Sequence, residues 1–280
     1  MSSSVLWLGE SACSDSNLVG GKAANLSRLS ATHRVPPGFC LPAHVQVSDA
    51  DIEEAYREMG ARCGIVEPAV AVRSSALDED GVANSFAGQH ETLLNVRGLA
   101  ELHTAVERCQ ESVRAPRALA YRRERGLTAS DTRLTVLVQQ LVFAEASGVL
   151  FSANPMTGSR GEAIVTTSWG LGESVVGGTV SPDTYVVRKA DLSIVAREMG
   201  SKRRMTVSVR GGTVEIDVPE HDRNRPSVTD AQCIDAVRMA ITLEDEMGWP
   251  VDVECAWHDD TCYLLQCRPI TTLSNPNIAG

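Results

Sequence analysis

Residues 250–268 read PVDVECAWHDDTCYLLQCR, two runs of alternating side chains with a polar segment between them. Alternation of this kind is typical of two antiparallel β-strands joined by a tight turn. A three-residue turn at 259–261 would pair positions whose numbers add up to 520. We therefore expect a β-hairpin here, and its register decides which side chains meet.

This register gathers four polar side chains on one face of the hairpin. Glu254 lies opposite Gln266, and Asp252 lies opposite Arg268. Carboxylate and amide oxygens suit a divalent cation, and a guanidinium suits phosphate. A solvated face with a cross-strand ion pair explains the same pattern. The apolar side chains that we expect on the other face are Val251, Val253, Tyr263 and Leu265.

The rest of the chain alternates between helix-like and strand-like patterns, which predicts an α+β or α/β class. A capping box at Thr229–Gln232 begins a helix that ends at Gly248, and apolar residues spaced by three or four predict a helix over 99–113. A further helix is expected over 117–126. Strands are expected at 134–142, 147–152 and 162–167 and in a meander after residue 183.

Composition limits the classes of partner. The 280 residues carry a net charge of -10, which would repel a nucleic-acid backbone. No apolar run is long enough to cross a membrane, and the start of the chain lacks the features of a signal peptide, so we expect a cytoplasmic protein. The eight cysteines form no C-x-x-C pair and are interpreted as reduced packing thiols, with a structural zinc site as the alternative.

Two basic residues in the first half are candidate phosphate contacts. Lys22 follows a pair of glycines at what looks like the start of a helix, although Ala23 excludes a Walker A loop. Arg73 ends a strand-like run and has the fork geometry that matches phosphate oxygens. The alternatives are an exposed lysine at a helix start and a surface arginine paired with Asp78 or Glu79.

Taken in order, a dozen motifs resemble the nucleotide-binding domain of the phosphoenolpyruvate synthase, pyruvate phosphate dikinase and rifampin phosphotransferase family. They include GGKAANLSRL, VPPGFCLP, AVRSSALDED, SFAGQHETLLNV, SGVLFSANPMTG, GLGESVVGGTVSPD, DVECAW and LLQCRPIT. The resemblance covers residues from about 15 to 273. It implies an α+β, two-lobed ATP-grasp fold with ATP bound between the lobes. We expect lobes at 1–130 and 131–280, the second containing the metal-binding hairpin 250–268.

The resemblance also assigns roles to matching positions. Lys22, Arg73 and Arg268 are implied as the catalytic and phosphate-binding cations, and Glu254 and Gln266 as magnesium ligands. The remaining positions implied in nucleotide binding are Gly88 and Gln89 in a loop over the phosphates, Arg117, the adenine-binding strand Gln139, Gln140, Leu141 and Val142, and Glu173 near the ribose or phosphates.

The implied activity is an ATP- and magnesium-dependent phosphotransferase of the dikinase type, which converts ATP to AMP and phosphate. In this family a histidine on a swivelling domain takes the phosphate, but the chain contains no G-G-x-x-[ST]-H-A motif. The acceptor is then a separate phosphohistidine-bearing protein or domain, or a small molecule, unless the chain is an excised domain. Two alternatives are a non-catalytic nucleotide-binding subunit and a ligase that acts through an acyl phosphate.

Overall fold

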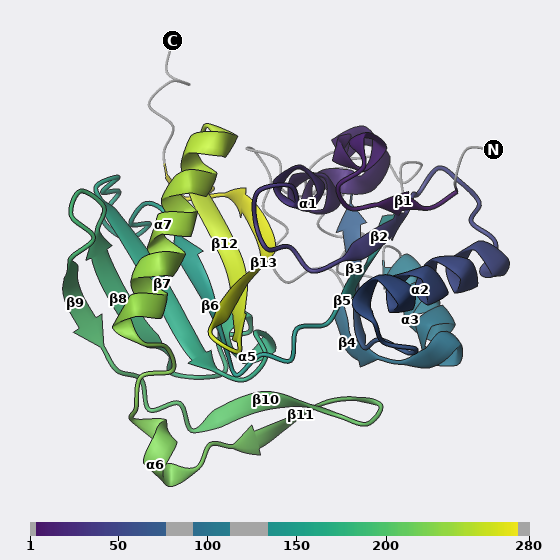
Figure 1. The fold of residues 1–280 in the computed structure, drawn as a ribbon. Helices are drawn as coiled ribbons and strands as arrows, with labels where there is room; N and C mark the ends of the chain where they lie inside the picture. The colour runs from purple at the N-terminus through teal and green to yellow at the C-terminus, as the bar shows by residue number, and fades with distance from the viewer. Residues whose placement is uncertain (1–3, 77–91, 113–133, 274–280) are drawn as a thin grey trace. The chain divides into compact units, whose positions relative to one another are not determined.

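The computed structural model describes residues 4–76, 92–112 and 134–273 (Figure 1). The chain divides into two compact units, the first holding most of residues 1–141 and the second most of 142–280. The division falls after Leu141 and not after residue 130, because the strand over 134–140 pairs with strands of the first unit. No helix in the described part of the chain is long and apolar enough to span a bilayer.

Unit 1 is built on a five-stranded sheet in the order β1-β2-β5-β3-β4, in which every neighbouring pair is antiparallel. Its strands are β1 (Leu6–Trp7), β2 (Gly38–Leu41), β3 (Val70–Ala76), β4 (Thr92–Val96) and β5 (Leu134–Gln140). Its helices are the 3₁₀ turn η1 (Ser11–Ser14), α1 (Ser16–Leu29), α2 (Asp49–Cys63) and α3 (Gly98–Ser112). The helix expected over 99–113 is thus confirmed as α3, whereas 117–126 lies outside the described residues.

The two faces of this sheet have different roles. One face packs against α2 and α3 in a continuous apolar core, to which β5 contributes Val136 and Val138 and β3 contributes Val70 and Val72. Strand alternation turns the odd-numbered residues of β3 and β5 to the opposite face. That face meets α1, where the Ser75 hydroxyl donates to a carbonyl of the helix.

Unit 2 contains a six-stranded antiparallel sheet in the order β13-β12-β6-β7-β8-β9. Its strands are β6 (Ala146–Phe151), β7 (Glu162–Trp169), β8 (Asp183–Arg188), β9 (Ile194–Glu198), β12 (Val251–His258) and β13 (Thr261–Pro269). A separate two-stranded sheet consists of β10 (Arg204–Val209) and β11 (Gly212–Asp217). The helices after β7 are α5 (Glu173–Val176), α6 (Glu220–Arg223) and α7 (Asp230–Met247). The strands expected from residue 134 onward are confirmed.

Helix α7 lies across the six-stranded sheet of unit 2 (Figure 1). It begins with the capping box expected from the sequence, since the Thr229 and Gln232 side chains each bind the other's backbone N–H. It ends at Gly248, whose φ of 75° lies in the left-handed region that glycine adopts without a steric penalty. The apolar residues of α7 that are buried include Cys233, Val237 and Leu243.

Candidate functional site

The hairpin β12–β13 has the predicted pairing where it carries the polar side chains. Glu254 is paired with Gln266, and Asp252 with Arg268. The turn itself differs from the prediction, because it contains two residues, Asp259 and Asp260, both with positive φ. Two positive φ values are typical of the type I′ turn, which matches the twist of the strands better than a longer loop does.

A β-bulge reconciles the shorter turn with the predicted pairs. The register shifts by one residue between Glu254 and Cys255, so Leu265 is the extra residue on β13. On the turn side of the bulge, Tyr263 pairs with Ala256 and therefore shares a face with Glu254. The prediction that Tyr263 lies on the apolar face was wrong for this reason, and Leu265, expected on the same face, is the unpaired residue of the bulge.

Asp252 and Arg268 form an ion pair on the polar face of the hairpin. The Nε of Arg268 donates to Oδ2 of Asp252 at 2.8 Å, and Asp252 is only 8% exposed. Burial raises the pKa of the Asp252 carboxyl, while the Arg268 guanidinium opposes that shift. The other oxygen, Oδ1, is shielded from solvent and has no hydrogen-bond partner among the described residues. A buried carboxylate oxygen of this kind is costly unless a further group binds it.

Glu254 and Gln266 form the next cross-strand pair on the same face, two residues along each strand from this ion pair. Gln266 is buried and Glu254 is half-buried. Glu254 and Gln266 carry oxygen atoms of the hard type that magnesium prefers, and Asp252 adds a carboxylate two residues away along β12. The residues present therefore fit a magnesium ion with Arg268 beside it for phosphate.

Lys22 is not the exposed lysine that the alternative interpretation required. It is 7% exposed, and its Nζ donates to the backbone carbonyl of Ser74 on β3 at 3.2 Å. Helix α1 is interrupted at Gly20, where φ is 78°, and Lys22 lies in the first turn after the interruption. The glycine pair thus sets the direction of the helix that delivers this ammonium group to the sheet.

Arg73 and Gln139 lie on the face of the unit 1 sheet that meets α1. Arg73 is opposite Leu137, and Gln139 is opposite Ala71. Arg73 is half-buried, whereas Gln139 is 1% exposed and its Nε2 donates to the carbonyl of Pro36. The structure therefore brings Lys22, Arg73 and Gln139 to one side of unit 1.

The remaining positions implied in nucleotide binding lie in several different parts of the chain. The N–H groups of Gln140 and Leu141 donate to the carbonyls of Pro37 and Ala69. Glu173 is exposed in the first turn of α5. Val142 belongs to unit 2 and is half-buried. Three predicted positions, Gly88, Gln89 and Arg117, lie outside the described residues.

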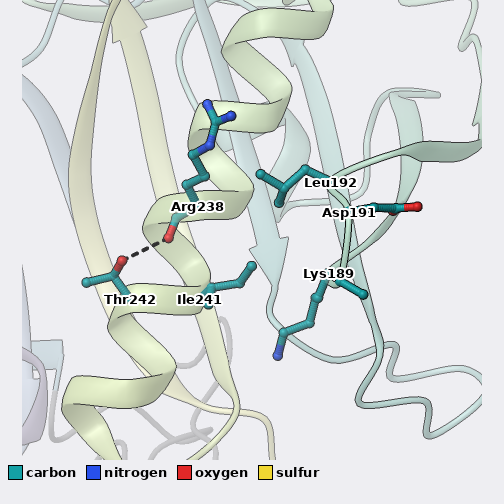
Figure 2. A pocket seen from close by; sticks show the side chains of 7 residues that line it. Lys189, Asp191, Leu192, Arg238, Ile241 and Thr242 are labelled. Atoms are coloured by element: carbon teal, nitrogen blue, oxygen red, sulfur yellow. Dashed lines mark hydrogen bonds between the residues drawn. The ribbon is translucent and has the colours of Figure 1, made fainter.

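Unit 2 has two further features outside the polar face of the hairpin, a hollow and a group of potential cation ligands. A shallow hollow of about 530 Å³ lies between α7 and the turn after β8 (Figure 2). Its cations are already paired, Lys189 with Glu244 at 2.7 Å and Arg238 with Asp235 at 2.6 Å, so it offers no obvious phosphate contact. At the turn end of the hairpin, the donor atoms of Glu145, His258 and Asp259 lie within 4.8 Å of one another.

Residues 42–279 match the family of the pyruvate phosphate dikinase AMP/ATP-binding domain. The chain belongs to this family. The match confirms the resemblance drawn from the motifs, and it includes Arg73 and all of β12 and β13. Lys22 precedes the matched range.

Several curated relatives are similar over most of the chain. The probable phosphoenolpyruvate synthase of Methanocaldococcus jannaschii is 34% identical over 96% of this chain and 27% of its own length. The phosphoenolpyruvate synthase of Pyrococcus furiosus is 41% identical over 80% of the chain and 28% of its own length. The rifampicin phosphotransferase of Streptomyces sviceus is 37% identical over 91% of this chain and 34% of its own length. The chain thus spans about a quarter to a third of these relatives.

Solved structures give more distant similarities. A D-alanine–D-alanine ligase from Bacillus anthracis matches with a TM-score of 0.40 and 10% identity, over 95% of this chain and 60% of the ligase. The protein PH1788 from Pyrococcus horikoshii matches with a TM-score of 0.44 and 12% identity, over 93% of this chain and 94% of PH1788.

One charged pair of unit 2 was missed by the sequence analysis. Lys202 and Asp183 are both fully buried, and their Nζ and Oδ1 atoms lie 2.5 Å apart. Oδ2 of Asp183 accepts from the backbone and hydroxyl of Ser227. Asp183 ends the motif GLGESVVGGTVSPD and Lys202 lies 19 residues later, but nothing in this spacing indicated that they would meet.

The role of the Arg268 guanidinium in binding phosphate can be tested by substitution. Arg268→Lys keeps the charge but loses the fork that can bind Asp252 and phosphate together. We expect the affinity for ATP with magnesium to fall about tenfold or more, since a hydrogen bond to a charged group contributes about 1.5–3 kcal/mol. Calorimetry measures the affinity. The control is Arg188→Lys, at an exposed pair on β8, and equal affinities for the two variants would contradict the assignment.

Proposed function

We propose that residues 1–280 form the ATP-binding, phosphate-donating part of a dikinase-type phosphotransferase that uses magnesium. The observation that carries the proposal is the polar face of the hairpin, where Glu254 and Gln266 are paired beside the Asp252–Arg268 ion pair. The family membership, whose description includes AMP/ATP binding, supports the nucleotide. The enzymatic activities named for the relatives support the reaction class.

Each assigned side chain has a task in this reaction. Phosphoryl transfer needs positioning and stabilisation of charge more than covalent chemistry from the protein. Lys22, Arg73 and Arg268 are the cations assigned to the phosphates, and each would offset negative charge there. Glu254 and Gln266 would hold magnesium, which offsets the phosphate charge when it is bound. Asp252 holds the Arg268 guanidinium in place.

The proposed products are AMP and phosphate. The β-phosphate of ATP passes to the acceptor, and the γ-phosphate is released as orthophosphate. The overall reaction consumes one water molecule, which supplies the additional oxygen of the orthophosphate. The two competing functions make different predictions: a ligase that forms an acyl phosphate releases ADP, and a non-catalytic subunit releases neither nucleotide. Identification of the nucleotide that accumulates with ATP and magnesium, with and without a candidate acceptor, separates all three.

Nucleotide binding itself can be tested by thermal unfolding. ATP with magnesium at 100 times its dissociation constant is expected to stabilise the chain by about 2.7 kcal/mol. The unfolding temperature should therefore rise with ATP concentration, and isothermal calorimetry should record heat. An unchanged unfolding temperature at millimolar ATP and magnesium, with no heat of binding, would refute the proposal. GTP at the same concentration serves as the control for base selectivity.

We further propose that the phosphate acceptor is a histidine outside residues 1–280. The support is the lack of the G-G-x-x-[ST]-H-A motif in this sequence. The chain alone is expected to convert ATP slowly, because phosphotransferases exclude water from the reacting phosphate. Incubation with β- and γ-labelled ATP, with and without a phosphohistidine domain in trans, measures this. Rapid AMP formation or an acid-labile phosphoenzyme on the chain alone would contradict it.

A further inference from the structure

Two cysteines far apart in the sequence meet in unit 1. Cys13 lies in η1 and Cys40 in β2, and their Sγ atoms are 3.6 Å apart. Both residues are 0% exposed. A disulfide requires an S–S distance of about 2.05 Å, so the sulfur atoms would have to approach by about 1.5 Å. The short, single-turn η1 is the element that can make this movement with the least loss of hydrogen bonds.

The surroundings of the pair distinguish the two thiols. A hydrogen bond with Cys40 and another with Ser27 lower the pKa of Cys13, although burial opposes this shift. The same contact with Cys13, together with burial, raises the pKa of Cys40. Thiolate is the reactive form of cysteine, so Cys13 is the nucleophile of the pair and Cys40 the resolving thiol.

Reagents can reach Cys13 by a local opening. Its chain neighbours Ser11 and Ala12 are exposed, so the short turn that carries the thiol lies at the surface of the unit. Local openings of such short elements cost far less than global unfolding. Cys40 is 0% exposed and lies on β2, which is paired on both sides, with Leu6 of β1 and Leu137 of β5 opposite it.

We propose that Cys13 and Cys40 are a redox modification site, oxidised by peroxides to an intramolecular disulfide that weakens ATP binding. The Cys13 thiolate attacks the peroxide, an S–O bond forms and the O–O bond breaks, which leaves a sulfenic acid and releases water or an alcohol. The Cys40 sulfur then attacks the sulfenic sulfur, the S–S bond forms and water leaves. Two thiols and one hydrogen peroxide thus give one disulfide and two waters, and a dithiol reductant reverses the change.

The link to ATP rests on the proposed function. Cys13 lies two residues before Asp15, the N-cap of α1, and α1 carries Lys22. Cys40 is opposite Leu137 on β5, two residues before Gln139. The disulfide would pull η1 toward β2 and displace the start of the helix relative to this sheet. We therefore expect the oxidised chain to bind ATP at least about tenfold more weakly.

Peroxide treatment of the purified chain tests the modification directly. The number of thiols titrated in denaturant should fall by two from eight, and peptide mapping should join the Cys13 and Cys40 peptides. Dithiothreitol should restore all eight thiols. Eight thiols after peroxide, or a link between other cysteines such as Cys255 and Cys262, would overturn the proposal.

Variants separate the modification from its effect. Cys13→Ala and Cys40→Ala should each prevent the disulfide, whereas Cys109→Ala, at a buried thiol elsewhere in unit 1, should leave it intact. ATP affinity is measured by calorimetry on reduced and oxidised wild-type chain. Equal affinities in the two states would overturn the regulatory effect, while no binding in the reduced state would refute the proposed function and leave the peptide map as the test of the disulfide.

Discussion

Glu254→Ala is expected to lower the rate of ATP conversion to AMP by about 10²–10³, the usual cost of one electrostatic contact in a closed site. The carboxylate lies on the half-buried polar face of the hairpin, so its removal leaves the apolar face of β12 unchanged. The rate is measured with a phosphohistidine domain supplied in trans, as a function of magnesium concentration. Gln266→Ala should give a similar loss, because the two side chains are paired across the strands.

The matched control lies on the same strand. His258→Ala removes the imidazole of the other group of potential cation ligands, four residues from Glu254 along β12. This variant should keep the wild-type rate and the wild-type response to magnesium. A wild-type rate in Glu254→Ala would contradict the assignment of Glu254 as a magnesium ligand. An equal loss of rate in His258→Ala would show that the effect is not specific to Glu254.

The hairpin shows what the sequence could and could not predict. A three-residue turn at 259–261 predicted the pair Glu254–Gln266, and that pair is present in the hairpin. The two-residue turn and the bulge at Leu265 were not predicted. The turn is one residue shorter than expected and the bulge adds one residue to β13, so the pairs on the far side of the bulge are the predicted ones. A single error in turn length would have moved every side chain of one strand to the other face.

The environment of the cations could not be predicted from local pattern. Lys22 follows two glycines and looks like an exposed residue at a helix start, yet it is buried because α1 packs on β3. The ion pair of Lys202 with Asp183 has the same origin. Both depend on segments that are separated in the sequence and meet only in the folded unit, so no periodicity or spacing indicates them.

The domain boundary illustrates a related limit. The lobes expected with the family resemblance divide at residue 130, before the run that becomes β5. That strand pairs with β2 and β3, both from the first half of the chain, so it completes the sheet of unit 1. Strand pairing between distant segments decides where a unit ends, whereas the sequence pattern marks only where an element begins.

Lys202→Met is expected to cause the largest loss of stability among the variants considered. The ammonium also donates to the carbonyl of Gly200, and its side chain is inaccessible to solvent. Methionine fills a similar volume but leaves the carboxylate of Asp183 buried without its cation. Breaking a buried ion pair from one side costs about 3–5 kcal/mol, because the remaining charge is uncompensated. Urea unfolding followed by tryptophan fluorescence measures this loss.

Two further variants determine whether the effect comes from the buried charge. Arg188→Met breaks the exposed ion pair between Arg188, at the end of β8, and Asp191 in the following turn, and it should cost less than about 1 kcal/mol. In the double variant Lys202→Met with Asp183→Asn, the neutral amide keeps an oxygen that can accept from Ser227. Because no charge is then left buried, we expect the double variant to be more stable than Lys202→Met alone. A double variant no more stable than Lys202→Met would show that the unpaired carboxylate of Asp183 does not account for the loss.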